Sequence, residues 1–238
     1  MIPKVIHYCW FGGRPLPRLA ERCIDSWRRL MPDAEIRRWD ESNYDVACVP
    51  YTAAAARAGK WAFVSDYARL DIVYQHGGIY LDVDVELLKP LDDLLGFVAF
   101  CGLERGGKVN SGLAFGAEKG CRIIGEFRDD YLGRTEFRAC PEILTEILER
   151  HGFIRENLRQ RVGELEILPT EYFDPVDEFG ILNTTHFSYA RHYGLSSWYP
   201  TGWRMLRRAK ITLQQFAGQS VVCRLVQLKR LLLPQAKL

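Results

Sequence analysis

The sequence predicts an α/β domain, residues 1–202, followed by a basic helical tail, residues 203–238. The chain opens with strand, helix and strand patterns in turn, which is how a parallel α/β sheet usually begins. A second helix and strand, separated by a glycine pair, follow within residues 60–90. The charge is also uneven: no Asp or Glu follows Glu178, so residues 179–238 carry +9 and residues 1–178 carry −7.

Length and composition agree with one domain of catalytic size. The chain has 238 residues, 47% of them hydrophobic and 26% charged, as in an ordinary globular protein. Seven cysteines without a C-x-x-C pair predict reduced thiols in the cytoplasm, and neither a disulfide framework nor a zinc site. The apolar run at the N-terminus is too short for a signal peptide. No stretch reaches the roughly 18 apolar residues of a membrane span, so we expect a soluble or peripheral protein.

The first elements are indicated by periodicity and by turn residues. Val5–Phe11 is an apolar run closed by Gly12-Gly13, as expected of a buried strand. Arg18–Leu30 repeats apolar residues at three-to-four spacing, which predicts a helix with one buried face. Glu35–Trp39 is predicted to be the next strand, and the alanine-rich Tyr51–Ala58 a short helix.

The later segments predict the rest of the sheet and its covering helices. Strands are expected at Phe97–Leu103 and Val109–Phe115, which a glycine-rich turn joins, and at Leu165–Leu168, which ends at a proline. Helices are expected at Cys121–Leu132 and Glu142–Arg150.

The most informative pattern in the chain joins a helix, a glycine pair and a strand. Trp61–Tyr74 has helical periodicity, Gly77-Gly78 ends the helix, and Ile79–Leu81 is a short apolar strand. At the end of that strand lie Asp82 and Asp84, whose i, i+2 spacing points both carboxylates the same way. Two carboxylates held in this way repel each other unless a cation lies between them.

A D-x-D pair alone is weak evidence for a metal site, because such pairs also occur in solvated turns on edge strands. The preceding helix adds Asp66 and Arg69 at i, i+3, on one face of a largely apolar segment. Such a pair is usually a surface ion pair. Since this one lies close in sequence to the possible metal site, it is also a candidate for holding a substrate.

The chain resembles the bacterial members of glycosyltransferase family 32 in three blocks: IPKVIHYCWFGGRPLP, WAFVSDYARLDIVYQHGGIYLDVDVEL and YARHYGLSSW. These DXD-containing sugar transferases include capsular-polysaccharide and lipooligosaccharide enzymes, with wider kinship to yeast initiating mannosyltransferases and clostridial glucosylating toxins. The specific part is S-D-x-x-R followed by G-G-x-Y-x-D-x-D. The resemblance implies a GT-A fold, a Rossmann-like mixed sheet that binds a nucleotide-sugar where its strands end, as open α/β sheets generally do.

The resemblance also implies roles for the charged residues of the central block. Asp84 is expected to bind a divalent cation, Mn²⁺ or Mg²⁺, that bridges the donor diphosphate. Asp82 is expected to contact the metal and its waters and the ribose or sugar. Asp66 and Arg69 would hold the donor sugar near its anomeric carbon. Carboxylate oxygens suit these hard cations, which would offset the charge of the leaving nucleoside diphosphate.

Five further residues match the family more weakly. Trp10 matches an aromatic position that stacks on or near the nucleotide base, although a buried strand tryptophan would give the same pattern. Asn110 resembles an asparagine near the diphosphate and the reaction centre. His192, Ser197 and Trp198 match a late block that closes over the diphosphate and the metal, with His192 as a third metal ligand.

The family resemblance implies a retaining reaction without a covalent nucleophile. In that account the acceptor attacks on the same face of the sugar, and the leaving phosphate assists its deprotonation. The two-carboxylate scheme of glycoside hydrolysis is therefore not a template here. Catalysis would come from positioning and from charge stabilisation. His7, in the first block, is expected to be a hydrogen-bonding residue of the core, and residues 170–180 are expected to form a loop.

The implied partners are a nucleotide-sugar donor, a UDP-sugar by preference, and a glycan or polyprenyl-linked acceptor. Two other function classes stay open. One is a D-x-D phosphohydrolase with Asp82 as its nucleophile, although such motifs usually lie near the N-terminus. The other is a non-catalytic glycan-binding or assembly protein.

The basic tail is predicted to form two helices, with an apolar stripe over residues 203–217 and a second stretch at Val221–Leu233. A basic amphipathic helix is attracted to anionic lipid. We therefore expect a cytoplasmic protein, attached peripherally to the inner face of the cell membrane. No nucleic-acid partner is expected, because the basic residues have no interleaved aromatics.

Overall fold

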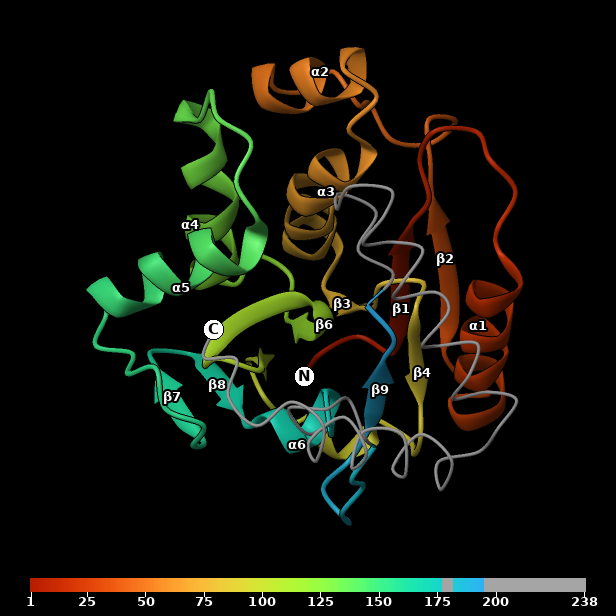
Figure 1. Ribbon diagram of the computed structural model, residues 1–238, viewed down its shortest axis with the longest axis vertical. Coiled ribbons are helices and arrows are strands. Elements are labelled where there is room, and N and C mark those ends of the chain that lie inside the picture. The colour runs from red at the N-terminus through yellow and green to blue at the C-terminus, as the bar shows by residue number, and fades with distance from the viewer. Residues whose placement is uncertain (177–181, 195–238) are drawn as a thin grey trace, which may run out of the picture.

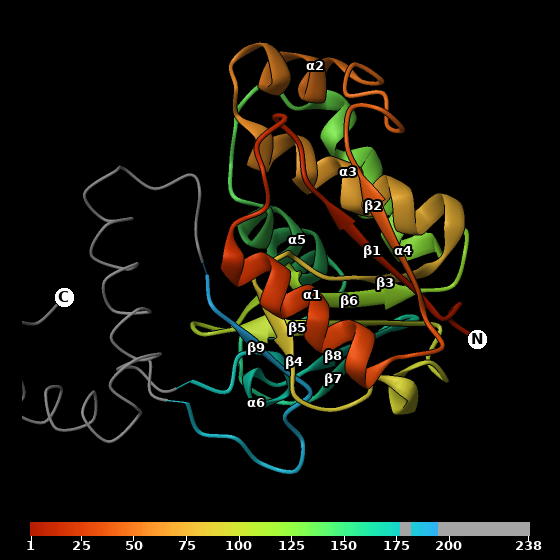
Figure 2. The same cartoon turned by 90° about the vertical axis from the view of Figure 1, so that its right-hand side faces the viewer.

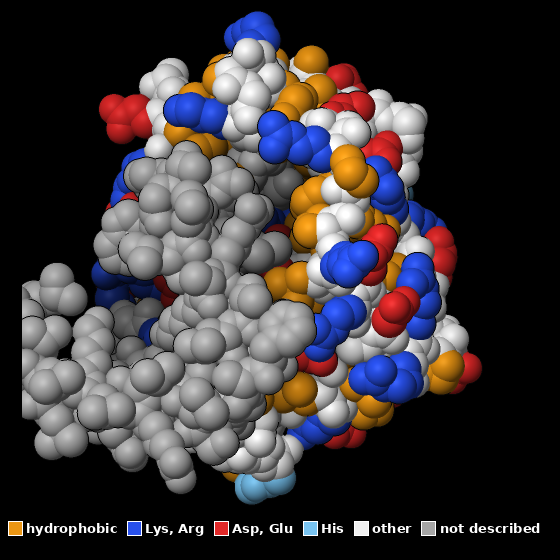
Figure 3. Space-filling view, turned by 45° about the vertical axis from the view of Figure 1, so that its right-hand side comes forward, with side chains coloured by type: hydrophobic (Ala, Val, Ile, Leu, Met, Phe, Trp, Pro, Cys, Tyr) orange, Lys and Arg blue, Asp and Glu red, His pale blue; other side chains and the backbone are white. Residues whose placement is uncertain are grey.

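The computed structural model describes residues 1–176 and 182–194 of the chain. Ser197, Trp198 and the predicted tail lie outside the described residues, so their predicted roles stay predictions. Where Figure 3 shows the described surface, Lys and Arg side chains are interspersed with Asp and Glu. On this face the described surface therefore carries charges of both signs.

A seven-stranded mixed sheet forms the centre of the described fold, in the order β2-β1-β3-β6-β5-β8-β7 (Figure 1). Strands β2, β1 and β3 are parallel, whereas β6 runs antiparallel between β3 and β5, and β8 is parallel to β5. A second, two-stranded sheet pairs β4 with β9. The strands are β1 Val5–Cys9, β2 Glu35–Trp39, β3 Gly78–Tyr80, β4 Val85–Leu87, β5 Ala99–Glu104, β6 Lys108–Ala117, β7 Gln160–Val162, β8 Leu165–Leu168 and β9 Ala190–His192.

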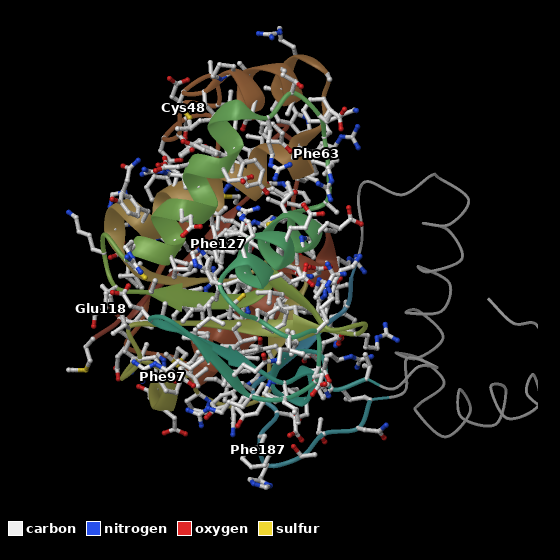
Figure 4. All side chains as sticks on the ribbon, turned by 90° about the vertical axis from the view of Figure 1, so that its left-hand side faces the viewer. Cys48, Phe63, Phe97, Glu118, Phe127 and Phe187 are labelled. Atoms are coloured by element: carbon white, nitrogen blue, oxygen red, sulfur yellow. The ribbon has the colours of Figure 1, made fainter. Side chains whose placement is uncertain are left out.

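Helices cover both faces of the sheet (Figure 2). On one face α1 packs beside β4 and α6 packs on β5, whereas α2, α3, α4 and α5 form the layer on the other face. Phe127 of α4 lies in the middle of that helical layer, and Phe187 lies at the far end of the molecule (Figure 4). The helices are α1 Arg18–Leu30, α2 Pro50–Arg57, α3 Trp61–His76, α4 Arg122–Asp130, α5 Cys140–Arg150 and α6 Thr170–Phe173, with 3₁₀ turns η1 Asp92–Leu94 and η2 Tyr131–Gly133.

Alternate strand residues separate two hydrophobic cores, one on each face of the sheet. In β1, Ile6 and Tyr8 join the core under α1, whereas Cys9 joins the core under α3. Trp27 of α1 is fully buried and donates its indole N–H to the carbonyl of Val85 at 2.7 Å. This bond fixes β4, and with it the chain that follows the D-x-D pair.

The glycine pair between α3 and β3 turns the chain back along the sheet. Gly77 and Gly78 have φ of 68° and 110°, values that other residues rarely adopt. A Cβ on Gly78 would also lie 2.8 Å from His7 Nε2. His7 is fully buried, bonded to Gly77 and to the indole of Trp39, so its predicted role as a hydrogen-bonding core residue is confirmed.

Most predicted elements are confirmed within a few residues, and α1, β2 and β8 have the predicted bounds. The predicted loop over residues 170–180 is wrong in its first part. Thr170–Phe173 forms one helical turn, because Pro169 precedes it and the Phe173 ring packs fully buried in the core. The six described cysteines are free thiols, in agreement with the reduced state expected. No helix among the described residues is long and apolar enough to cross a membrane.

Candidate active site

Polar residues from several strands converge on the edge of the sheet where β3 and β5 end. Asp82 follows β3, and Glu104 closes β5. Strand β6 starts at this edge because it runs antiparallel to both neighbours. The backbone N–H of Asp82 donates to the Gly112 carbonyl at 3.2 Å, and Asn110 pairs with Gly102. The site therefore lies at the strand ends, where an open α/β sheet is expected to bind its ligand.

The small β4–β9 sheet brings His192 to the D-x-D pair. Val85 lies opposite His192, and the backbone N–H of Tyr193 donates to the Asp84 carbonyl at 3.0 Å. One ligand atom each from Asp82, Asp84 and His192 all lie within 4.8 Å of one another. The His192 Nε2 atom is 3.4 Å from Asp84 Oδ1. Two carboxylates and one imidazole at this spacing fit a divalent cation.

The charges of this cluster are strongly coupled. Burial disfavours the charged form of His192, but the adjacent Asp84 outweighs burial and, with Asp174 and Asp82, raises the pKa of His192 to about 9. Burial raises the pKa of Asp82, Arg69 opposes that shift, and repulsion from Asp84 adds to it. With these neighbours His192 holds a proton at neutral pH. A metal ion bound through His192 must therefore displace a proton.

Arg69 joins the S-D-x-x-R motif to the D-x-D pair. Its Nη2 atom lies 3.0 Å from Asp66 Oδ1 and 3.3 Å from Asp82 Oδ1. The guanidinium is fixed from behind, since Nε donates to the Ser65 carbonyl and the group lies 4.9 Å from the Tyr80 ring centre. Asp66 and Arg69 are buried, so the ordinary interpretation as a surface ion pair is wrong. One guanidinium here serves two carboxylates.

Asp66 is held by the start of α5 as well as by Arg69. Burial raises the pKa of Asp66 to about 7, although the Arg69 charge opposes this. The nearby Asp82 charge raises the pKa further, and a hydrogen bond from the backbone N–H of Cys140 lowers it. Cys140 is the first residue of α5, where free N–H groups favour an anionic partner.

Asn110 lies at the centre of a small hydrogen-bond network in β6. Its Nδ2 donates to Glu104 Oε2 at 2.7 Å, and its Oδ1 accepts the N–H of Gly112 at 2.7 Å. A carboxylate only accepts and an amide N–H only donates, so these partners fix the orientation of the carboxamide. A Cβ added to Gly112 would collide with Asp82 Oδ2 and lie 2.9 Å from Arg69 Nη1. Glycine here lets β6 lie directly against the acidic cluster.

Sequence reasoning missed three residues of this site: Glu104, Gly112 and Asp174. Glu104 and Asp174 both interact electrostatically with His192. Glu104 could have been noticed as an acid directly after a predicted strand. Gly112 and Asp174 gave no usable signal, because their position depends on the register of β6 and on the turn after α6.

Trp10 lies directly after β1, at the same edge of the sheet. Its indole N–H donates to the Arg14 carbonyl at 2.6 Å, and its ring is half-buried against the core under α1. The structure thus places Trp10 at the end of a strand with part of its ring exposed. Its stacking on a nucleotide base stays a prediction.

The amino-terminal part of the chain matches a known family. Residues 17–100 match the family described as "Glycosyltransferase sugar-binding region containing DXD motif". Inositol phosphoceramide mannosyltransferase 3 of Schizosaccharomyces pombe is 34% identical over 107 residues, which are 42% of this chain and 29% of that protein. The uncharacterized glycosyltransferase L373 of Acanthamoeba polyphaga mimivirus is 30% identical over 109 residues, 42% of each chain. The chain thus matches less than half the length of these relatives.

Two solved structures resemble the fold at low sequence identity. The PaToxG glycosyltransferase has a TM-score of 0.50 at 19% identity, covering 63% of this chain and 68% of its own. A glycosyltransferase involved in the glycosylation of the major capsid of PBCV-1 has a TM-score of 0.50 at 10% identity, covering 85% of this chain and 98% of its own. At these identities the likeness speaks for the fold alone. Residues 17–100 thus match the model of the glycosyltransferase family whose sugar-binding region contains the DXD motif, and the described domain has the predicted GT-A fold.

Proposed function

We propose that this chain is the catalytic domain of a metal-dependent, retaining glycosyltransferase. In this proposal it transfers a sugar from a nucleotide-sugar, a UDP-sugar by preference, to a glycan or polyprenyl-linked acceptor in cell-surface glycan synthesis. One observation supports it above all: Asp82, Asp84 and His192 place ligand atoms within 4.8 Å of one another, directly beside Arg69. These residues come from distant parts of the chain, and the β4–β9 pairing brings them together.

The chain's own residues would divide the work by position. Asp82, Asp84 and His192 would hold Mn²⁺ or Mg²⁺, which when bound offsets the charge on the departing nucleoside diphosphate. Arg69, fixed by Asp66, would orient the donor sugar with its guanidinium N–H groups. The side chain of Asp82 is 29% exposed, so it can reach a ligand at the mouth of the site. Asp84 is buried below it.

The hydrogen-bond pattern supports a mechanism without a covalent enzyme intermediate. Asp66 is paired with Arg69, and Asp82 accepts from Arg69 and from the Tyr80 hydroxyl at 3.2 Å. Carboxylates engaged in this way hold other groups and are poor nucleophiles. Same-face attack, assisted by the leaving phosphate, needs from the protein only positioning and electrostatic stabilisation.

The same observation weakens the phosphohydrolase alternative. In that alternative Asp82 would attack phosphorus, but its Oδ1 is taken by Arg69 and Tyr80. A non-catalytic glycan-binding protein is separated from an enzyme by turnover. Such a protein would bind a donor, yet it would neither hydrolyse the donor nor transfer its sugar.

The test is a thermal-shift panel of UDP-, GDP- and CMP-sugars with and without Mn²⁺, followed by donor hydrolysis. Mannose-bearing donors belong in the panel because one relative is named a mannosyltransferase. We expect stabilisation by a UDP-sugar that requires the metal. In Asp84→Asn this stabilisation should vanish and donor turnover should fall by about 100-fold or more.

The matched control is Asp33→Asn, which changes a carboxylate that is 84% exposed and should leave both readouts unchanged. Metal-independent donor binding that survives in Asp84→Asn would contradict the proposal.

The cellular location is part of the same proposal. No acidic residue follows Glu178, so the last part of the chain can be attracted to an anionic membrane surface near a polyprenyl-linked acceptor. Flotation with anionic vesicles tests this. The full chain should float with the vesicles more than a chain ending at Trp203, and equal recovery of the two would contradict membrane attachment.

A further inference from the structure

Behind the Asp66–Arg69 pair, three buried polar atoms have no hydrogen-bond partner: the hydroxyls of Tyr51 and Tyr131, and Asp66 Oδ2. Tyr51 and Asp66 are 3% exposed and Tyr131 is fully buried. No other side-chain atom in this condition occurs among residues 1–176 and 182–194. All the unsatisfied buried side-chain atoms of the described fold thus belong to these three residues. In Asp66 the unsatisfied atom is Oδ2, whereas Arg69 pairs with Oδ1.

The three residues come from three elements that pack together, since α2 contacts both α3 and η2. The Tyr51 ring of α2 meets the Tyr131 ring of η2 edge-on, with ring centres 5.0 Å apart. Burial, and after it the Asp66 carboxylate of α3, raises the pKa of Tyr51. Burial also raises the pKa of Tyr131, and the Cys140 thiol, which interacts with the Tyr131 hydroxyl, and then Asp66 add to that shift. Tyr67, the neighbour of Asp66 in α3, has its ring centre 6.1 Å from that of Tyr131.

A buried hydroxyl or carboxylate oxygen without a partner is costly, and proteins usually satisfy such groups with an ordered water that makes about three hydrogen bonds. The chemistry here matches one water molecule. It would accept from the hydroxyls of Tyr51 and Tyr131 and donate to Asp66 Oδ2. Its second hydrogen would face the sulfur of Cys140, which lies close to Tyr131 and contacts Ser111 Oγ at 3.1 Å.

We propose that Tyr51, Tyr131 and Asp66 bind one ordered water, and that the two tyrosines are positioning residues for the donor site. Asp66 Oδ1 holds Arg69 at 3.0 Å, and Arg69 reaches Asp82 at 3.3 Å. Anchoring Oδ2 prevents the carboxylate from turning away from the guanidinium. Without that anchor Asp66 keeps only Arg69 and the backbone N–H of Cys140 as partners, so the carboxylate fixes the guanidinium less firmly relative to the sugar. This kinetic consequence rests on the proposed function, whereas the water site does not.

The first test is a high-resolution crystal structure of the full chain. We expect density for a water within hydrogen-bond distance of all three atoms, and loss of that density in Tyr51→Phe and Tyr131→Phe. An absent water, or a tyrosine hydroxyl bonded directly to Asp66 Oδ2, would overturn the proposal. This test needs no enzymatic activity.

The second test is donor turnover by Tyr51→Phe, Tyr131→Phe and the double variant. Each single change should lower kcat by about tenfold, the loss of one hydrogen bond to a charged network, with the apparent affinity for Mn²⁺ unchanged. Because both hydroxyls act through one water, the double variant should lose no more than the worse single variant. Tyr67→Phe, a buried tyrosine of the same helix, is the control and should keep the wild-type kcat.

The two proposals fail in different ways. A wild-type chain without metal-dependent donor turnover refutes the proposed function, and the crystal structure still decides whether the water is present. Turnover with an unchanged kcat in both tyrosine variants, or with fully additive losses, refutes the positioning role alone.

Discussion

The two ends of β3 bury polar groups under opposite conditions. Before the strand, the indole N–H of Trp39 donates to His7 Nδ1 at 3.1 Å, and His7 Nε2 lies 2.9 Å from the Gly77 carbonyl. An indole N–H only donates and a carbonyl only accepts, so Nδ1 is the acceptor and Nε2 carries the proton. The imidazole is therefore neutral, with both nitrogens satisfied. After the strand, the carboxylates of Asp82 and Asp84 stand together beside His192, and Arg69 lies against Asp82.

The same side chain consequently responds to burial in opposite ways at the two ends. Burial lowers the pKa of His7 to about 4, whereas Asp84 and its acidic neighbours overcome burial and raise the pKa of His192 to about 9. A buried polar group such as His7, with one hydrogen-bond partner for each of its polar atoms, stabilises the fold. A buried cluster that holds two carboxylates side by side costs free energy through their repulsion, and a bound cation can offset that cost. Exposure alone would not identify the candidate site, because its acids Asp66 and Asp84 are buried, as His7 is. The balance of charges around each buried group distinguishes the candidate site from the core.

The largest effect that we predict here is a loss of folding stability on acidification, caused by protonation of His7. The pKa of His7 is about 4 in the folded chain and 6.5 in the unfolded chain, so the unfolded state binds its proton more readily. The stabilisation is complete above pH 6.5, declines as the pH falls, and is lost near pH 4. The total change should be about 3 kcal/mol in the free energy of unfolding. Urea unfolding of wild type and of His7→Gln across this range measures it.

The difference between those two curves isolates His7, because titrations elsewhere, including His192 with its opposite sign, are common to both proteins. His186→Gln changes an exposed histidine and should follow the wild-type curve. If His7→Gln and wild type lose stability in parallel between pH 6.5 and pH 4, His7 is not the neutral core group inferred here.

The sequence was informative where a pattern is local. The periodicity of Arg18–Leu30 predicted the bounds of α1, and the spacing of the central block brought Asp66, Arg69, Asp82 and Asp84 together as candidates. Strands β4 and β9 have three residues each, too few to show a period of two, so the contact between Asp84 and His192 followed from the family resemblance alone. The positions of Glu104 and Gly112 depend on the register between β5 and β6, which no short stretch of sequence encodes.

The next largest effect is expected for Gly112→Ala, which should disturb the acidic cluster that follows β3 and lower donor turnover. The added Cβ collides with Asp82 Oδ2 and crowds Asn110 Oδ1 at 3.0 Å, so either β6 or the carboxylate must move. Overpacking of this kind costs about 1–3 kcal/mol, which corresponds to a loss of roughly 5- to 150-fold if it falls on donor turnover. Metal-dependent thermal shift and donor hydrolysis measure the two consequences.

Gly96→Ala is the matched control for that variant. No atom lies within 4 Å of the added Cβ at Gly96, and its φ is not in the left-handed region. Wild-type turnover in Gly112→Ala would show that the acidic cluster tolerates displacement. It would contradict the view that the groups after β3 must be held in a fixed geometry for function.

The smallest predicted effect concerns Glu104. This acid is both a hydrogen-bond partner of Asn110 and a charged neighbour of His192. Its Oε2 accepts from Asn110, as a structural partner would, while burial raises its pKa and the His192 charge opposes that shift. If its role is to orient Asn110, Glu104→Gln should keep most activity, because the amide oxygen still accepts that hydrogen bond. Glu104→Ala should lower kcat by about 5- to 10-fold, the worth of one hydrogen bond. Equal losses in both variants, accompanied by weaker Mn²⁺ binding, would show instead that its negative charge belongs to the ligand-binding cluster.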